Sequence, residues 1–558
     1  MASDNSVAER GDRPVLIIGG PPTTNGDMHI GHVAGPYVAA DVWSRYLRAT
    51  GREVMFASGG DDSQTYVFTT AARLGTTPPE LAAKSWEQIK GTWQAMGIDV
   101  DGFAPTDEGY RSNVYDYVHR LYDMGKFRLR TVRLPYSEAK QMFLVEGLVG
   151  GECPTCLADS RGGICEGCGH PVDFDALIDP YSIMDPSDPV SYRETEILVF
   201  PLEEYRQQLI EFHQSKEASW RPHAVAFIRE LLAKPLPDFP ITYPVAWGMP
   251  AKFAETPGQT LNAWLEGMPA SMYCHAFAQR ELGIEAPTND DAWNAEHDAE
   301  LVFFVGFDNL FIWAAVHIAE LIAHEGKYVL PDTILCNEFY ELENEKFSTS
   351  KGHLVWARDL VAEVPRDIVR FYLNLSAPEH SRTNFSRAAL AKVAGNRLVG
   401  PWNDLAAKLA KLTAEVGAPD LANIEPLPVS PRTPAYAAAM VERFSLCFEL
   451  TSFSLSRAAD LIVQNVERLR RHAERALAGN LDPDELKVRL GDLFVQLRAL
   501  VVCASPILID LADRAARAGE FDLRIDPAAF DVTHTTAFTV PTLDLVSTLD
   551  PTVTTNPV

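Results

Sequence analysis

Two short apolar runs near the start of the chain predict the first strands of a parallel sheet. Val15–Ile18 is uninterrupted and ends at Gly19–Pro22 (GGPP), as a buried strand does at an abrupt stop. A segment with helical periodicity follows and ends at Gly51, after which Glu53–Ala57 forms a second apolar run that ends at Gly59–Asp62. Such a strand–helix–strand unit predicts a doubly wound α/β sheet, whose ligands bind beyond the carboxyl ends of the strands.

The pattern changes twice further along the chain. The stretch from about Ser112 to Pro250 is irregular and predicts an insertion, and the apolar run Leu301–Val305 predicts a return to the sheet. From about Arg387 the sequence is rich in Ala, Leu and Arg with helical periodicity, which predicts an all-α domain. The expected fold class is α/β, a Rossmann-like doubly wound parallel sheet with an insertion, plus a C-terminal helical bundle.

Composition narrows the class of protein without identifying it. The chain has 558 residues, of which 46% are hydrophobic and 22% are charged, and this excludes wholesale disorder. Its 49 Lys+Arg against 76 Asp+Glu give a net charge of −27, which argues against binding nucleic acid through the overall field but leaves a local basic groove open. No membrane span and no signal sequence are visible, so we expect a cytoplasmic protein.

Four of the eight cysteines form two C-x2-C pairs, Cys153 with Cys156 and Cys165 with Cys168. Each pair can direct two thiolates at one tetrahedral ion, and glycines beside them relieve strain in such turns. We expect these four thiolates to hold a structural Zn²⁺; the alternative, four unrelated thiols, would require an accidental double repeat. Because four sulfur ligands complete the coordination of zinc, we expect no catalytic role for the ion.

Two further segments carry candidate chemistry. His29–His32 (HIGH) follows the first strand, and two imidazoles so spaced at a helix start can stabilise charge on the α-phosphate of ATP, while Gly31 lets a nucleobase approach the backbone. Lys346–Gly352 (KFSTSKG) is a cationic loop whose lysines can neutralise a departing pyrophosphate. Taken singly, the first is also compatible with surface histidines and the second with an ordinary solvated loop.

Together these segments resemble the HIGH and KMSKS signatures of class I aminoacyl-tRNA synthetases. With the cysteine pairs inside the insertion, the chain is similar to methionyl-tRNA synthetases in particular, over about residues 14–520 and in consistent order. Trp264–Glu266 and Phe304–Asp308 also match segments of that family. The resemblance implies the following organisation: a flexible tail (1–13), the first half of the Rossmann catalytic domain (14–112), a connecting insertion with a zinc knuckle (113–255), the second half of the catalytic domain (256–338), a KMSKS-like loop and stem-contact region (339–387), a helical anticodon-binding-like domain (388–520) and a C-terminal tail (521–558).

The resemblance implies activation of an amino acid, whose carboxylate attacks the α-phosphate of Mg²⁺-bound ATP to give aminoacyl-AMP and pyrophosphate. The carboxylate is already an anion at pH 7, so positioning and charge stabilisation must supply the catalysis. The implied site residues are His29, His32, Lys346 and Lys351 for catalysis; Asn25, Gly31, Gly306, Asp308 and Ser350 for ATP; and Asp62, Thr23, Trp264 and Trp313 for the amino acid, with Asp62 on its α-ammonium group.

The chain departs from the family at the expected methionine pocket. The family's aromatic residue before the histidines falls at Thr23, a family histidine falls at Trp313, and the Asp of the W-L-D-A-P segment is Glu266. One methylene group more or less on a substrate changes the selectivity of a tightly fitting apolar pocket by roughly 1–3 kcal/mol, and replacing whole side chains of the pocket can change it by more. We therefore expect the protein to select a different amino acid. The alternative is that our gap-free matching of this sequence to the family is shifted by one residue, and that neighbouring side chains form the methionine pocket instead.

The expected anticodon positions also differ. They fall at Gly400 and Asp404, and an Asp in place of an Arg repels phosphate; the stacking Pro-Trp pair of the family is missing near Val466–Arg471. Arginines between Arg468 and Arg475 could still touch RNA, although a solvated helix face is an equally good interpretation. The second Lys of KMSKS is Thr349, with Lys351 two residues on.

Three functions remain open on this sequence. The favoured one is an amino-acid-activating enzyme that transfers the acyl group to a small-molecule amine, such as an N-hydroxylated amine, in specialised metabolism. Hydrazine synthetases resemble this arrangement and pair a synthetase-like domain with a cupin, which would here be a separate partner. The alternative is a divergent methionine–tRNA ligase that charges tRNA. The third is a non-catalytic regulator, against which the intact His29, His32 and Lys346 argue.

Overall fold

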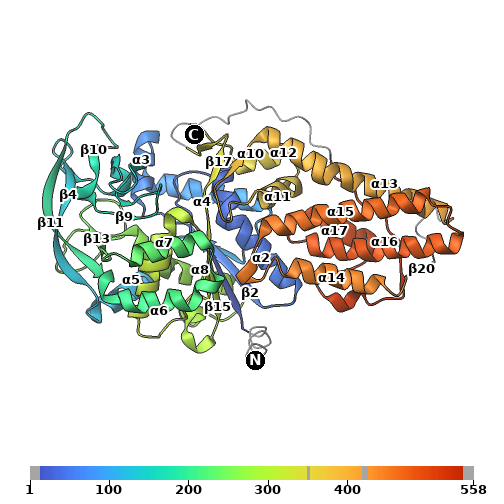
Figure 1. Ribbon diagram of the computed structural model, residues 1–558. Helices are drawn as coiled ribbons and strands as arrows, with labels where there is room; N and C mark the ends of the chain where they lie inside the picture. The colour runs from blue at the N-terminus through green and yellow to red at the C-terminus, as the bar shows by residue number, and fades with distance from the viewer. Residues whose placement is uncertain (1–12, 349–351, 418–424, 545–558) are drawn as a thin grey trace.

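The computed structural model describes residues 13–348, 352–417 and 425–544, and it is elongated, with a parallel sheet between an insertion and a helical bundle (Figure 1). The five strands of the sheet are all parallel and have the order β16-β15-β1-β2-β3. Their bounds are β1 Val15–Gly19, β2 Val54–Gly59, β3 Gly102–Ala104, β15 Glu300–Gly306 and β16 Thr333–Asn337.

Helices cover both faces of this sheet. Successive side chains of a strand point to opposite faces, so Val15 and Ile17 of β1 enter one core while Leu16 and Ile18 enter another. The first core includes α2 (Val38–Ala49), α4 (Pro78–Met96) and α11 (Arg366–Leu375), and the second includes α5 (Glu108–Asp123), α8 (Gly267–Glu281) and α9 (His317–Ala323). The predicted doubly wound sheet is confirmed.

The strand order reverses at β1, which pairs with β2 on one side and with β15 on the other. In open α/β sheets a crevice forms at such a switch point, outside the carboxyl ends of the strands. Gly20 follows β1 at this edge and Gly306 ends β15, and both line one cavity. The strand order alone therefore predicts a ligand site at the carboxyl ends of β1 and β15.

The insertion carries its own antiparallel sheet. Strands β4 (Arg128–Ser137) and β11 (Val190–Pro201) pair over most of their length in the order β12-β11-β4-β5. Helix α5 crosses the boundary expected at residue 113 and packs on α8, so it belongs with the parallel sheet and not with the insertion. The other elements are β5 Met142–Phe143, β6 Val149–Glu152, β7 Asp159–Ser160, β8 Gly163–Ile164, β9 Pro171–Val172, β10 Ile178–Ser182, α6 Arg206–Lys216, α7 Pro222–Leu232, β12 Asp238–Pro240, β13 Thr242–Tyr243 and β14 Thr260–Leu261.

The C-terminal part is the predicted helical bundle, at the opposite end of the molecule from the insertion (Figure 1). Its helices are α12 Arg387–Ala394, α13 Gly400–Glu415, α14 Thr433–Ser445, α15 Leu455–Ala478, α16 Pro483–Ala504 and α17 Ile509–Gly519. Between α12 and α13 the backbone makes a π-helical turn, Gly395–Val399. None of the helices in the described residues is long and apolar enough to span a bilayer.

The described part of the expected C-terminal tail packs back onto the bundle. Trp402 donates its indole N–H to the carbonyl of Pro541 at 2.8 Å, and Asn403 exchanges two hydrogen bonds with the backbone of Leu543. Remaining short elements are α1 Ile30–His32, α3 Thr65–Leu74, β17 Tyr340–Leu342, β18 Glu345–Lys346, α10 Ala357–Glu363, β19 Thr383–Phe385, β20 Leu427–Pro428 and β21 His534–Thr535.

Candidate functional site

A cavity of about 340 Å³ lies at the carboxyl edge of the sheet, between the loops after β1, β2 and β15 and the cysteine-bearing turns of the insertion. Seven of the residues expected from the sequence line it: Thr23, Asn25, His32, Trp264, Gly306, Asp308 and Trp313. His29, Gly31 and Lys346 adjoin this group, as described below. Ser350 and Lys351 lie outside the described residues.

The two histidines of the HIGH segment are stacked on one another. Their ring centroids are 3.6 Å apart and the planes are inclined by 15°. His29 is the N-cap of α1, and its Nδ1 accepts a hydrogen bond from the backbone N–H of His32 at 3.3 Å. Because Nδ1 is the acceptor, the neutral ring carries its proton on Nε2, where it can be donated.

Both rings are neutral near pH 7. Burial lowers the pKa of His29 well below its usual range, and the neighbouring His32 and Lys346 lower it further. Burial likewise lowers the pKa of His32 to about 4, although Glu166 opposes this effect. The pair can therefore act toward an anion as neutral N–H donors and not as imidazolium ions.

The two described ends of the lysine loop (346–352) contact the HIGH segment. Phe347 stacks on the ring of His29, with centroids 4.6 Å apart, and a Cβ at Gly31 would lie 2.8 Å from Phe347. On the other side of the loop, Ile30 donates its backbone N–H to the carbonyl of Val355 at 2.8 Å. Gly31 thus serves the close approach of Phe347, a role that the sequence did not suggest.

At the other end of the cavity the two acids after β2 behave differently. The carboxylate of Asp62 accepts hydrogen bonds from Thr24, at 2.7 Å, and from Thr106, and Asp62 is not among the cavity-lining residues. Asp61 does line the cavity, and its Oδ1 has no hydrogen-bond partner among the described residues. Burial and the nearby Glu266 raise the pKa of Asp61 well above its usual range.

More unpartnered polar groups surround Asp61. Both amide atoms of Gln64 and one oxygen of Glu266 lack a hydrogen bond of good geometry in the described structure, and both residues are almost fully buried. The Gln64 amide still interacts with the Asp61 carboxyl and lowers its pKa, against the larger effect of burial. The other oxygen of Glu266 accepts from Ser63 at 3.0 Å and from Tyr110 at 2.9 Å, and burial raises the pKa of this carboxyl to about 7. Sequence reasoning singled out Glu266 only as a departure from the family and did not bring it together with Asp61 and Gln64, because about 200 residues separate the two segments.

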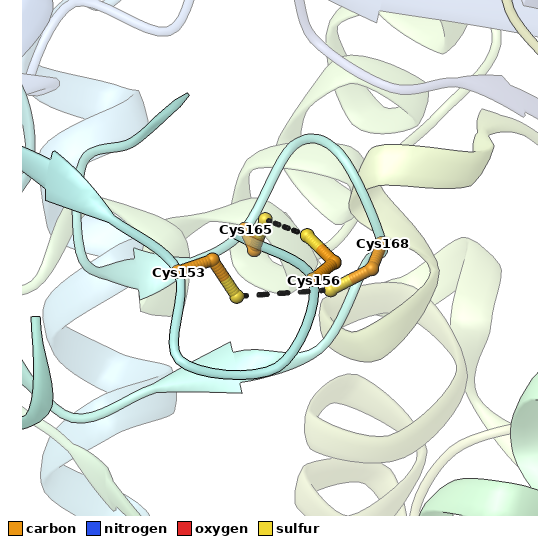
Figure 2. Close-up of side chains that lie close together, drawn as sticks. All are labelled: Cys153, Cys156, Cys165 and Cys168. Carbon is orange, nitrogen blue, oxygen red and sulfur yellow. Dashed lines mark hydrogen bonds between the residues drawn. The ribbon is translucent and has the colours of Figure 1, made fainter. Parts of the chain in front are cut away.

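The four cysteines of the insertion converge, as Figure 2 shows. Their sulfur atoms all lie within 4.8 Å of one another, with Cys153 and Cys168 at 3.9 Å and Cys156 and Cys165 at 3.6 Å. A tetrahedral zinc with Zn–S bonds of about 2.3 Å requires S···S edges of about 3.8 Å. The donor set and its spacing therefore fit a Cys₄ zinc site.

The local backbone supports thiolates at this centre. The N–H groups of Thr155 and Gly167 donate to the sulfurs of Cys153 and Cys165, each at 3.3 Å. These turns follow β6 and β8, so the short strands of the insertion aim both pairs inward. The cavity is also lined by three residues of the second cysteine turn and the segment just before it, Gly162, Ile164 and Glu166. The centre is therefore a wall of the cavity as well as a support for the insertion.

A second cavity, of about 460 Å³, lies in the helical bundle between α13 and α15. The expected anticodon positions Gly400 and Asp404 both line it, together with Arg470. Arg470 is bound by three carboxylates, those of Glu467 at 2.7 Å, Asp404 at 3.1 Å and Glu474 at 3.4 Å. Its charge is therefore neutralised, whereas Arg471 and Arg475 are exposed.

The sequence of this chain is similar to those of known tRNA synthetases. Residues 15–410 match the family model of class I (M) tRNA synthetases. The chain is 31% identical to a methionine–tRNA ligase of Porphyromonas gingivalis over 73% of its own length and 59% of that protein, and 31% identical to one of Thermomicrobium roseum over 69% and 65%. It is 32% identical to one of Roseiflexus sp. over 72% and 68%. The match spans less than two thirds of the first two relatives.

Solved structures show the same fold. The methionyl-tRNA synthetase of Mycobacterium tuberculosis in complex with methionyl-adenylate superposes with a TM-score of 0.74 at 18% identity, over 95% of this chain and 99% of that one. At this identity the likeness establishes the architecture alone. The family model, by contrast, covers well over half of the sequence, including the HIGH segment, the lysine loop and the cysteine centre. The chain belongs to the class I (M) tRNA synthetase family.

Proposed function

We propose that the protein activates an amino acid with ATP, forming an aminoacyl-adenylate and pyrophosphate. The observation that carries this proposal is that His32, a neutral N–H donor, and several carboxylates line a single cavity at the switch point of the sheet, with His29 stacked on His32 and Lys346 paired with the cavity-lining Glu166. The test is amino-acid-dependent exchange of labelled pyrophosphate into ATP, measured across the proteinogenic amino acids. Exchange with no amino acid at all would contradict the proposal.

In this proposal ATP lies along the edge formed by the HIGH segment and the end of β15. Asn25, Gly306 and Asp308 line the part of the cavity that holds the nucleotide, whereas Gly31 is covered by Phe347. Burial raises the pKa of Asp308 to about 6, so this carboxyl is mostly ionised at neutral pH. Mg²⁺ enters with the triphosphate as part of the substrate. The N–H groups of His29 and His32 stabilise charge that develops on the α-phosphate, and Lys346 and Lys351 receive the departing pyrophosphate.

The α-ammonium group of the amino acid binds Asp61 and not the neighbouring Asp62. The free oxygen of Asp61 and its raised pKa both indicate a missing cation, which an ammonium group supplies. Asp62 instead fixes the loop through Thr24 and Thr106. Thr23, Trp264 and Trp313 form the remaining walls of this subsite.

Asp61→Asn is therefore expected to raise the KM for the amino acid about 10- to 100-fold, since a hydrogen bond to a charged group contributes roughly 1.5–3 kcal/mol. Asp62→Asn is the matched control, one residue away and of the same chemistry, and should change this KM far less while lowering the melting temperature. The measurement is pyrophosphate exchange as a function of amino acid concentration. A larger effect from Asp62→Asn than from Asp61→Asn would reverse the assignment.

The identity of the amino acid follows from the same subsite. The relatives are methionine–tRNA ligases, so methionine is the first candidate. A thioether, however, cannot satisfy the unpartnered amide of Gln64 and oxygen of Glu266, which are costly to bury without partners. Exchange with methionine alone supports the family substrate, and exchange with a polar amino acid supports a changed pocket.

For the acceptor, we propose tRNA first, because the three relatives reported above are methionine–tRNA ligases and none of their names suggests a small-molecule amine or a cupin partner. One observation counts against tRNA and keeps a small amine as the second candidate: the cavity at Gly400 and Asp404 is lined by carboxylates that neutralise Arg470 and would repel phosphate. Charging of total tRNA with the amino acid that supports exchange separates the two. Adenylate formation without tRNA charging would favour the amine.

A further inference from the structure

Glu166 lies inside the second cysteine turn, between the zinc ligands Cys165 and Cys168, and it reaches the catalytic loop. Its Oε2 is 2.5 Å from Nζ of Lys346, and Glu166 lines the cavity of the proposed active site. The turn that carries Glu166 is well defined, since Cys165 accepts a backbone hydrogen bond from Gly169 at 2.7 Å and donates one to His170 at 2.9 Å. A rigid turn of the insertion therefore presents a carboxylate to the lysine.

Lys346 has two possible anionic partners at this place. Glu166 contacts it directly, and Asp308 of the nucleotide subsite favours its charged form from further away; together they raise the pKa of Lys346 against partial desolvation. The ion pair is half exposed, with 59% of the Lys346 side chain and 46% of the Glu166 side chain accessible to solvent. Its charge is felt in turn by His29 and His32. The ammonium group is therefore held beside the cavity-lining Glu166, near enough to His29 and His32 for its charge to lower their pKa values.

We infer that Glu166 is a positioning residue for Lys346: it holds the ammonium group where the pyrophosphate will leave. The inference rests on the proposed function, since it assigns a partner to a lysine of that site. A lysine side chain has several rotatable bonds, and fixing it in advance avoids that cost in the transition state. The carboxylate also repels the incoming triphosphate, so its presence weakens the binding of ATP in the ground state while it favours the chemical step.

Through Glu166 the cysteine centre would affect catalysis, although its metal ion would take no direct part in the reaction. Four thiolates leave zinc no open position, so the ion cannot touch a substrate. By ordering the turn between Cys165 and Cys168, however, the ion would fix the direction of the Glu166 side chain. The insertion then contributes to the phosphate subsite through one ion pair, in addition to the wall formed by Gly162 and Ile164.

The test is Glu166→Gln, which keeps the size of the side chain and removes its charge. We expect kcat for pyrophosphate exchange to fall about tenfold and the KM for ATP to fall three- to tenfold, a pattern that indicates loss of an interaction that aids the transition state and strains the ground state. Glu166→Asp should restore part of kcat. Glu152→Gln, an exposed acid directly before Cys153, is the matched control and should change neither value.

A binding measurement separates this inference from the proposed function. Calorimetry with ATP alone, at low salt and with zinc content verified as equal, should show a three- to tenfold lower Kd for Glu166→Gln than for the wild type, and the difference should shrink as salt screens the charges. An unchanged Kd and kcat, or a raised KM with unchanged kcat, would overturn the role of Glu166. If the wild type binds ATP but exchanges no pyrophosphate, the proposed function fails while the effect of Glu166 on ATP binding is still measured.

Discussion

Replacing His29 by Ala should reduce amino-acid-dependent pyrophosphate exchange by about 10²- to 10³-fold, the usual cost of removing one donor aimed at charge in a transition state. The ring of His29 is nearly fully buried between His32 and Phe347, and its Nδ1 is engaged by the backbone of α1, which leaves the Nε2–H to donate. The loss should appear in kcat, with a smaller change in the KM for ATP. Steady-state exchange kinetics with the preferred amino acid are the measurement.

The matched control is His297→Ala, at a half-exposed histidine on the surface, which should leave exchange unchanged. Exchange within threefold of the wild type in a folded His29→Ala protein would show that the HIGH segment is not catalytic here. A pH profile gives an independent check. Since the pKa of His32 is about 4 and the neutral ring is the active form, this residue should leave the rate flat from pH 8 to 6 and reduce it as the pH falls toward 4.

The lowered histidine pKa values also predict the direction of acid destabilisation. A histidine that is neutral when buried and takes up a proton near pH 6.5 once unfolded stabilises the fold above that pH. This contribution to the free energy of unfolding should be lost progressively as the pH falls from 6.5 to about 4, where folded His32 titrates as well. Urea denaturation at several pH values measures the slope.

Replacing Cys165 by Ser should remove the metal and impair the enzyme together. Structural zinc sites bind with roughly 10–16 kcal/mol of apparent free energy in small zinc peptides, so the loss of one thiolate should leave bound zinc well below the roughly one ion per chain expected of the wild type. Exchange should fall about 10²-fold, because the cysteine turns form a wall of the cavity and misplacements of about 1 Å near the chemistry cost that much.

Cys447→Ser is the control for this change. Cys447 is also buried, but it lies in the helical bundle, where its thiol donates a hydrogen bond to the backbone carbonyl of Arg443. Zinc content by mass spectrometry and exchange should both remain at the wild-type level. If Cys165→Ser lost its zinc but kept full exchange, the insertion would be a separate module without effect on the cavity, and the inference about Glu166 would lose its basis.

Much of this architecture could be predicted from patterns along the chain. The apolar runs at Val15–Ile18 and Leu301–Val305 are continuous because both faces of their strands are covered by helices, and the paired cysteine spacing specifies a tetrahedral centre almost by itself. The helical bundle was visible because long amphipathic helices carry the strongest periodic signal. These features depend on local sequence, which is why they needed no three-dimensional information.

The contacts that decide the chemistry could not be predicted in this way. Asp61 and Asp62 are chemically identical neighbours, and only the positions of Thr24 and Thr106 distinguish the one that is engaged from the one that is free. Glu166 carried no signal, since a glutamate between two cysteines is ordinary and Lys346 lies far away along the chain. The expected tail after residue 520 lacked periodicity, yet its described part packs on the bundle through Trp402 and Asn403.

The central claim is that an amino acid carboxylate attacks the α-phosphate of ATP in this cavity. Its most direct test uses an amino acid whose carboxylate is labelled with ¹⁸O in both oxygens, incubated with ATP and the enzyme and trapped with hydroxylamine. Attack on the α-phosphate transfers one labelled oxygen to AMP when the adenylate is cleaved, and mass spectrometry should find AMP with a single ¹⁸O. Release of ADP, or of AMP without label, would contradict the account.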